Sequence, residues 1–214
     1  MAAGRVDLPL MAAWLAARSL SRGLPTPVLD SGGVRVDTGH ADERQRYAFV
    51  QPCEGLRDLG QSITRPFVAL KLCGPADDLL AMLPGHWAIS SRSWVMGRVE
   101  SNQAETALPD GYDLSIEGDG PVWAARIVDR AGVLAASGYA VEQGGVFIYD
   151  RIRTEPAYER RGLGRALMTA LGRCRRDVGS REILIATAAG RALYLTLGWR
   201  DLAPYSTAMI PPNA

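Results

Sequence analysis

Apolar positions near the start of the chain recur with the period of a helix. Between residues 8 and 22, one face collects apolar side chains at spacings of three or four residues: Leu10, Ala13, Trp14, Ala17 and Leu20. This periodicity predicts an amphipathic helix that packs on a core. The stretch is closed by Arg18 and Arg22, and no run of eighteen apolar residues occurs in the chain. We therefore expect a cytoplasmic protein with no membrane partner.

The rest of the first half alternates short apolar runs with segments of helical period. These patterns predict strands over 34–36, 47–50, 66–72 and 87–99, and helices over 54–63 and 76–83. The next segment, 100–120, is polar and contains Pro109 and three glycines. Because such a composition is typical of a linker, we expect a domain boundary there, near residue 110.

The second half has a cleaner pattern. It predicts strands over 121–130, 133–141, 146–155, around 183–185 and up to about 210, and helices over 163–176 and 188–197. The first of these helices has the strongest periodicity in the chain, and its last turn is expected to hold Arg173, Arg175 and Arg176. This order predicts a mixed α/β fold in which a mostly antiparallel sheet contains one βαβ crossover.

Two short segments resemble each other across the halves. Residues 79–87 (LLAMLPGHW) and 193–199 (LYLTLGW) both run from an apolar helix into a turn that ends on a tryptophan. A helix and an apolar strand precede the segment in each half. We hypothesise that residues 30–100 are a degenerate half-repeat of the second half, and chance similarity is the alternative.

Composition narrows the function classes. The 214 residues carry 24 basic and 23 acidic side chains, a formal net charge of +1, which argues against a nucleic-acid partner. Three cysteines and two histidines are isolated from one another, so we expect no metal site and no disulfide framework. Lys71 is the only lysine beside 23 arginines. We interpret this bias as typical of a GC-rich bacterial genome and draw no function from it.

The segment that carries chemistry lies at residues 158–167, where a strand gives way to the most periodic helix. Gly162 and Gly164 allow the backbone to turn so that several N–H groups converge at the positive end of a helix dipole. Arg160, Arg161 and Arg165 add positive charge. This arrangement predicts a cradle for a pyrophosphate. It is not a nucleotide P-loop, which requires GxxxxGK[ST], nor a dinucleotide fingerprint, which usually opens a domain.

Three blocks together resemble the GNAT N-acetyltransferase superfamily over residues 115–210. Residues 159–164 match the family's [Gln/Arg]-x-x-Gly-x-[Gly/Ala] signature at both glycines, with Glu159 as a departure at the first position. Residues 192–199 (ALYLTLGW) look like the family's helix-and-turn block, and residues 152–158 (IRTEPAY) look like its strand-to-loop block. The resemblance implies a mixed, mostly antiparallel twisted sheet flanked by helices over 111–214. Residues 1–110 would form an additional N-terminal α/β region that shapes the acceptor site.

The resemblance also implies acetyl-CoA as the co-substrate. The two strands at 146–155 and 182–187 should separate, and the pantetheine arm should enter between them like an added strand. The expected contacts come from the first strand and from the glycine segment: Ile152, Arg153, Thr154, Arg160, Arg161, Gly162, Leu163, Gly164, Arg165 and Ala166.

Three side chains are candidates for catalysis. Tyr194 matches the family position whose hydroxyl serves the leaving sulfur, with a packed helix tyrosine as the alternative. Asp150 and Glu155 are candidates for the general base or for binding the amine. Asp150 lies in an apolar strand, where a carboxylate is costly without a purpose, although it could pair structurally with Arg151 or Arg153. Water is an equal candidate for the base.

These expectations combine into an acetyl-CoA-dependent N-acetyltransferase that moves an acetyl group directly to a primary amine. The acceptor would be a small molecule or a peptide, and a homodimer is left open. The alternatives are a non-catalytic acyl-CoA-binding module and a paralogue without a ligand. Five scattered tryptophans, Trp14 among them, are candidates for an acceptor pocket but are more typical of core.

Overall fold

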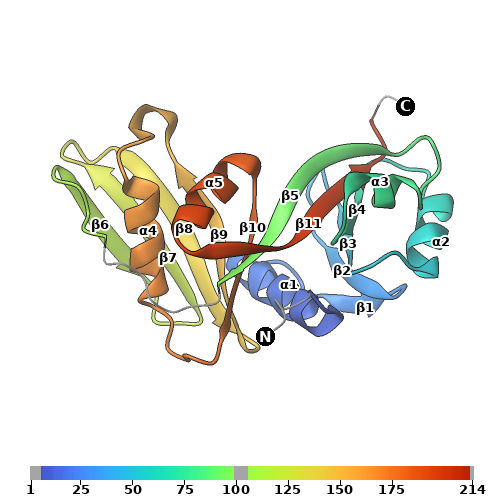
Figure 1. Ribbon diagram of the computed structural model, residues 1–214, viewed down its shortest axis with the longest axis horizontal. Helices are drawn as coiled ribbons and strands as arrows, with labels where there is room; N and C mark the ends of the chain where they lie inside the picture. The colour runs from blue at the N-terminus through green and yellow to red at the C-terminus, as the bar shows by residue number, and fades with distance from the viewer. Residues whose placement is uncertain (1–5, 99–105, 213–214) are drawn as a thin grey trace.

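The computed structural model describes residues 6–98 and 106–212 (Figure 1). Its first half holds three helices and five strands: α1 (Leu8–Arg22), β1 (Val28–Asp30), β2 (Gly33–Asp37), β3 (Gln45–Phe49), α2 (Glu54–Ser62), β4 (Val68–Leu72), α3 (Ala76–Leu80) and β5 (Ala88–Arg98). Asp7 accepts a hydrogen bond from the Leu10 N–H at 2.9 Å and caps α1, which ends where Gly23 takes a left-handed conformation.

The second half holds two helices, a short 3-10 turn and six strands. In chain order they are β6 (Tyr112–Glu117), β7 (Val122–Asp129), β8 (Leu134–Gln143), β9 (Val146–Thr154), the turn (Pro156–Tyr158), α4 (Leu163–Gly172), β10 (Arg181–Ala186), α5 (Ala188–Thr196) and β11 (Trp199–Met209). None of the helices among the described residues is long and apolar enough to cross a membrane.

All eleven described strands form one sheet, in the order β1-β2-β3-β4-β11-β5-β10-β9-β8-β7-β6. Most neighbours are antiparallel, and the β3–β4 and β9–β10 pairs are parallel. The predicted fold class is confirmed: a mixed, mostly antiparallel sheet flanked by helices, with a further α/β region at the N-terminal side. The long strands β5 and β11 lie side by side at the centre, as Figure 1 shows.

Side-chain alternation along the strands separates the two faces of the sheet. Phe147 packs in the cluster that contains α4 and Tyr194 of α5, whereas its neighbour Ile148 packs in the cluster that contains α1. In the first half, Phe49 faces α2 and α3, whereas Ala48 belongs to the α1 cluster. Helix α1 thus covers one face across both halves, and the other four helices lie on the opposite face.

Most predicted elements are present, with three differences. Residues 112–117 (YDLSIE), in the segment interpreted as a domain boundary, form strand β6; their apolar and polar residues alternate, but the polar composition of the whole segment outweighed that signal. Residues 100–105 lie outside the described residues. Helix α4 ends at Gly172, so Arg173 and the two arginines after it follow the helix instead of forming its last turn. Strand β1 was also not predicted, because three mostly exposed residues carry no pattern.

The two halves share one order of elements. Strands β1, β2 and β3 form an antiparallel set, α2 crosses to the parallel strand β4, and α3 leads to the long strand β5; β7, β8, β9, α4, β10, α5 and β11 repeat this order. The last strands are exchanged, because β11 pairs with β4 and β5 pairs with β10. The sheet order is therefore symmetric about the β5–β11 pair, apart from β6 at one edge.

Candidate active site

The centre of the site is the point where β9 and β10 separate. The two strands pair only from Val146 with Arg181 to Ile148 with Ile183, so the remainder of β9 has an edge without a strand partner on that side. A bulge follows, in which the pairing to β8 moves from Tyr139–Asp150 to Ser137–Arg153 and Arg151 takes a φ of +53°. A bulge turns the backbone and re-aims its side chains, so residues 149–154 line an open wedge.

The predicted anion cradle lies beside this wedge, at the start of α4. Arg160 and Gly162 both have positive φ, +63° and +81°, which bends the backbone immediately before the helix. Ala166 is the first residue whose N–H bonds to the turn, at 3.1 Å from the Gly162 oxygen. Within the described ranges, no backbone or side-chain acceptor takes the N–H groups of residues 160–165. They are free to bind an anion.

Gly164 is required for space. A Cβ built on this residue would lie 3.1 Å from Leu193 Cδ2 and 3.5 Å from Thr154 Oγ1, both of which belong to residues that line the cavity. A larger side chain would therefore fill the gap between α4, α5 and β9. The cradle, the wedge and this gap together fit a phosphate-bearing ligand with an extended arm.

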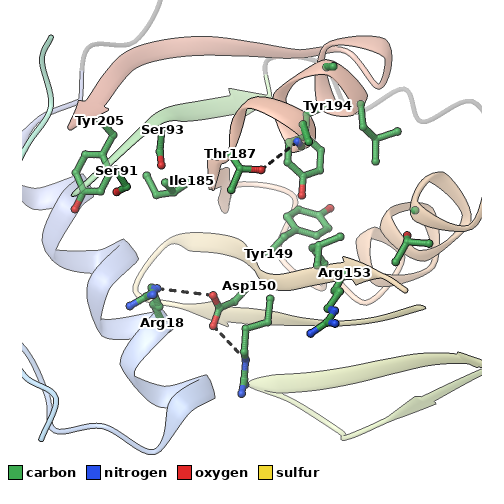
Figure 2. A pocket seen from close by; sticks show the side chains of 18 of the residues that line it. Arg18, Ser91, Ser93, Tyr149, Asp150, Arg153, Ile185, Thr187, Tyr194 and Tyr205 are labelled. Atoms are coloured by element: carbon green, nitrogen blue, oxygen red, sulfur yellow. Dashed lines mark hydrogen bonds and ion pairs between the residues drawn. The ribbon is translucent and has the colours of Figure 1, made fainter. Parts of the chain in front are cut away.

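These features open into one cavity of about 1050 Å³ (Figure 2). Most of the sequence-predicted binding residues line it: Ile152, Arg153, Thr154, Arg160, Gly162, Leu163, Gly164 and Arg165. Two predicted binding residues do not. Arg161 donates to the Tyr112 hydroxyl at 3.1 Å and to the Ala157 oxygen at 2.9 Å, on the side of β6. Ala166 is buried in the core, and its N–H is already bonded.

Tyr194 lines the cavity from α5. The Thr187 hydroxyl caps this helix by accepting the Gly190 N–H at 3.2 Å, and Figure 2 shows the Tyr194 ring below the cap with its hydroxyl directed toward Tyr149 and β9. Burial raises the pKa of Tyr194 to about 12. The phenol therefore keeps its proton throughout the neutral range and can act as a hydrogen-bond donor.

Tyr149, the second phenol at the wedge, is already engaged. Its hydroxyl donates to Glu182 at 2.7 Å, and Glu182 also accepts from Arg175 at 2.9 Å and lies 3.8 Å from Arg98. Burial and the Glu182 carboxylate raise the Tyr149 pKa well above its ordinary value. This network ties β9, β10 and β5 together where the wedge begins, so it stiffens the site. The Tyr194 hydroxyl, in contrast, has no hydrogen bond to any of the described residues.

The two candidate carboxylates have different surroundings. Asp150 lines the cavity and is 8% exposed, and both of its oxygens accept from Arg22, at 2.7 and 2.8 Å. Ser21, Arg18 and Arg151 also lie within 3.1 to 3.7 Å. The sequence-based alternative of a structural pair named Arg151 or Arg153; the main partner is Arg22 of α1, 128 positions away in the chain.

Glu155 lies outside the cavity lining. Its carboxylate pairs with Arg153 at 3.1 Å, and Figure 2 shows the Arg153 side chain directed away from the Tyr194 side of the site. Glu155 follows the last residue of β9 that lines the cavity, so its carboxylate does not face Tyr194 across the cavity. The structure therefore brings Tyr194 and Asp150 to one cavity, from opposite faces of the sheet, and leaves Glu155 at its rim.

Three residues of the first half and one of β11 form a group that lines the cavity, and of these only Trp14 was a candidate from the sequence. We call Trp14, Arg46, Lys71 and Tyr205 the donor pocket, because each lines the cavity and carries an N–H or O–H. Lys71 pairs with Glu43 at 3.2 Å, and burial lowers its pKa. Arg46 pairs with the same carboxylate. The one available signal for Lys71 in the sequence was that it is the only lysine, and we interpreted that as a genome bias.

The described part of the chain contains no group of three His, Cys, Asp or Glu side chains placed to hold a metal ion. The donor set of the cavity instead consists of backbone N–H groups, arginines and hydroxyls. These groups bind anions.

Comparisons with known proteins cover the part of the chain that forms this site. A family model described as an acetyltransferase (GNAT) domain matches residues 118–201, which include β9, the cradle and α5. No curated protein matches the chain by sequence. Among solved structures, a GCN5-related N-acetyltransferase from Kribbella flavida is similar with a TM-score of 0.67 and 16% identity, covering 97% of this chain and 96% of that one.

Two further structures give the same result. A GCN5-related N-acetyltransferase-like protein from Streptococcus suis has a TM-score of 0.62 and 14% identity, over 96% of this chain and 94% of that one. An acetyltransferase of the GNAT family from Novosphingobium aromaticivorans has a TM-score of 0.58 and 16% identity, over 95% and 97%. At these identities the likeness concerns the fold, and it extends over both halves. Residues 118–201 therefore match the GNAT acetyltransferase domain, the fold of the whole chain is similar to that of GNAT proteins, and both findings support an acyltransferase.

Proposed function

We propose that this protein is an acetyl-CoA-dependent N-acetyltransferase that acts on a primary amine of a small molecule or peptide by direct transfer. The observation that carries the proposal is the row of unbonded N–H groups over residues 160–165, next to the free edge of β9 and to Tyr194. Along one cavity, the anion cradle is followed by an extended slot and then by a buried phenol. This spatial order matches that of a pyrophosphate, a pantetheine arm and a thioester.

The binding roles follow from which groups are free. The N–H groups of residues 160–165, with Arg160 and Arg165, would hold the pyrophosphate. The unpaired edge of β9 over Ile152–Thr154 offers backbone groups to an extended arm, as a sheet edge does to an added strand. Bound acetyl-CoA supplies an activated acyl group with a thiol as the leaving group.

Tyr194 is placed to donate a hydrogen bond to the sulfur as negative charge develops there. Its raised pKa, about 12, keeps the hydroxyl protonated at neutral pH, which a donor requires. A phenol of that pKa is a weak acid beside a thiol, so its contribution is chiefly hydrogen bonding rather than complete proton transfer. The neutral amine is the nucleophile.

Asp150 is better suited to positioning than to accepting a proton. Both oxygens of this carboxylate accept hydrogen bonds from Arg22, and two further arginines lie near it, so its acceptor positions are occupied by α1 and β9 instead of facing an amine. It holds the C-terminal end of α1 against β9. We infer that water in the cavity removes the proton of the amine, and that Glu155, at the rim, takes no part in the transfer.

The N-terminal region contributes to the acceptor side. Arg18 and Arg22 of α1 and the donor pocket line the cavity on the face opposite α4 and α5. The cradle and Tyr194 lie on the α4 side, so the wedge joins a cofactor side to an acceptor side. We further propose that residues 30–100 are the degenerate half-repeat expected from the sequence, because the order of elements and the exchanged strands β5 and β11 make the sheet symmetric.

Calorimetric titration with acetyl-CoA tests the cofactor, and release of free thiol in the presence of amines tests the transfer. Micromolar binding followed by amine-dependent thiol release is the expected result. Binding without turnover of any amine would favour the non-catalytic acyl-CoA-binding module. The ion pair of Asp150 with Arg22 is compatible with that alternative. No binding by the wild-type protein would end the proposal.

A further inference from the structure

The donor pocket is the part of the cavity to which neither acetyl-CoA nor Tyr194 was assigned. Its members come from distant parts of the chain: Trp14 from α1, Arg46 from β3, Lys71 from β4 and Tyr205 from β11. Figure 2 shows Tyr205, with Ser91 and Ser93 beside it, at one end of the cavity, and Tyr194 toward the other. A molecule lying between these ends would have one end in the donor pocket and the other near Tyr194.

Three polar atoms of this pocket have no partner among the described residues. They are Trp14 Nε1, Arg46 Nε and the Tyr205 hydroxyl, and none of the three residues is more than 7% exposed. An unbonded polar group in the interior carries a large desolvation cost, so native proteins nearly always satisfy such groups. The indole and guanidinium nitrogens are donors only. The missing partner is therefore an acceptor of hydrogen bonds.

The charge around the donor pocket favours one kind of hydrogen-bond acceptor. Four basic side chains line it and contact two carboxylates: Arg18 and Arg22 with Asp150, and Arg46 and Lys71 with Glu43. Positive charge is in excess in a cavity with low-dielectric walls, which favours an anion over a neutral acceptor. Burial also raises the pKa of Tyr205, so its hydroxyl remains available as a donor.

We propose that the donor pocket binds an oxyanion, a carboxylate or a phosphate, carried by the acceptor, so that the substrate class is an amine bearing a compact anionic group. The inference rests on the proposed acetyltransfer. Each of the three atoms is covered in this structure, so a small shift of these side chains would let oxygen atoms of the anion accept from Trp14, Arg46 and Tyr205, with Lys71 contributing charge, while the amino group points toward Tyr194. A site whose buried donors require a substrate group discriminates strongly against analogues that lack it.

Matched acceptors test the proposal by steady-state kinetics with saturating acetyl-CoA. The pairs are an amino acid against its amide, and phosphoethanolamine against ethanolamine. We expect kcat/KM to favour the anionic member of at least one pair by about tenfold or more, the size of one charge-assisted hydrogen bond. The pair with the larger preference identifies the carboxylate or the phosphate as the natural group.

Two substitutions connect the preference to the pocket. Tyr205→Phe removes one unbonded donor and keeps the ring, and Lys71→Met removes one charge and keeps the length. Each is expected to lower the ratio of kcat/KM between the anionic and the neutral acceptor by about tenfold, mainly through KM. Val178→Ala, at an exposed position outside the cavity, is the control and should leave the ratio unchanged.

A binding measurement separates failure of this inference from failure of the acetyltransferase proposal. N-acetylglycine and N-acetylglycinamide, and N-acetylphosphoethanolamine, are titrated calorimetrically into the protein with and without CoA. Binding of an anionic compound that weakens in Tyr205→Phe supports the donor pocket even if no amine is turned over. Equal turnover of anionic and neutral amines, or no binding of either anion, overturns it; absence of acetyl-CoA binding overturns the acetyltransferase proposal instead.

Discussion

The two halves of the molecule have one topology and different local geometry. Strands β3 and β4 pair over all five residues of each, whereas β9 and β10 pair over three positions and then separate. Helix α2 begins after Cys53, in an ordinary extended conformation, and has Glu54 in its first turn, which disfavours an anion there. Helix α4 begins after Gly162, with positive φ and without an acid in its first turn.

This difference explains why the candidate site lies in the second half. Both halves bring a parallel strand pair close to the start of a crossover helix, so topology alone would create two equivalent sites. The second half departs from regular sheet at two places, the bulge at Arg151 and the turn at residues 160–162. The bulge leaves backbone groups of β9 without a strand partner among the described residues, whereas β3 is paired with β4 over its whole length.

Disruption of the cradle should change acetyl-CoA binding more than any other substitution considered. Gly164→Val should weaken acetyl-CoA binding about a thousandfold, because the added methyl groups displace the anion from at least two N–H donors worth about 2 kcal/mol each. Calorimetric titration measures the dissociation constant. Gly85→Val is the matched control in the first half, since a Cβ there has no atom within 4 Å. Unaltered binding by Gly164→Val would contradict the cradle.

A glycine of the first half should behave in the opposite way. In Gly55→Ala, the new Cβ would lie 2.0 Å from the Ser31 oxygen, so α2 must move away from the β1–β2 turn. We expect a loss of about 3 kcal/mol in the free energy of unfolding, measured by urea denaturation, with the acetyl-CoA affinity of the folded protein unchanged. A loss of affinity at unchanged stability would show that the first half also takes part in cofactor binding.

Tyr194→Phe removes the donor that faces the wedge. We expect kcat to fall by about a hundredfold while the acetyl-CoA dissociation constant changes little, because the hydroxyl acts on charge that develops during transfer. The aligned position of the first half is Leu80, partly exposed on α3. Leu80→Ala should leave kcat unaltered. Retention of full activity by Tyr194→Phe would remove Tyr194 from the mechanism.

The ion pair between Asp150 and Arg22 joins α1 to β9. A double-mutant cycle with Asp150→Asn and Arg22→Met should give a coupling of about 2 kcal/mol in the free energy of unfolding, since two hydrogen bonds at 2.7 and 2.8 Å connect the side chains. If Asp150 is a positioning residue, raising the pH will not rescue the activity of Asp150→Asn. A shift of the pH–rate profile in that variant would instead identify Asp150 as the general base.

The smallest effect is a dependence on alkaline pH. Burial raises the pKa of Tyr194 from an ordinary 10 to about 12, so between these values the unfolded chain loses a proton that the native protein keeps. Stability contributed by the neutral phenol is complete below pH 10 and is lost as the pH rises toward 12. At pH 11 the wild type should have lost about 1.4 kcal/mol relative to Tyr194→Phe. Parallel denaturation curves for the two proteins measure this difference.

The candidate site was predictable to the extent that it consists of backbone. Gly162 and Gly164 mark a turn at a helix start, and that pattern alone indicated an anion cradle, which the unbonded N–H groups support. Long-range partners were not predictable. Arg151, one of the two neighbours named as alternative partners of Asp150, does lie 3.6 Å from it, but the main partner is Arg22 on α1, and no local pattern links positions 128 residues apart.

Hydrophobic periodicity and the glycine segment were enough to predict most helices, the fold class and the proposed kind of ligand, because each depends on residues close together in the chain. The edge strand β6 was not predicted, although its residues alternate between apolar and polar, because it lies in a polar segment rich in glycine and acidic residues that was interpreted as a boundary. The cavity itself arises from the exchange of β5 and β11 and from α1 lying across both halves. These contacts bring Trp14, Lys71 and Tyr205 together, and such burial is a property of the packed chain that separate segments do not encode.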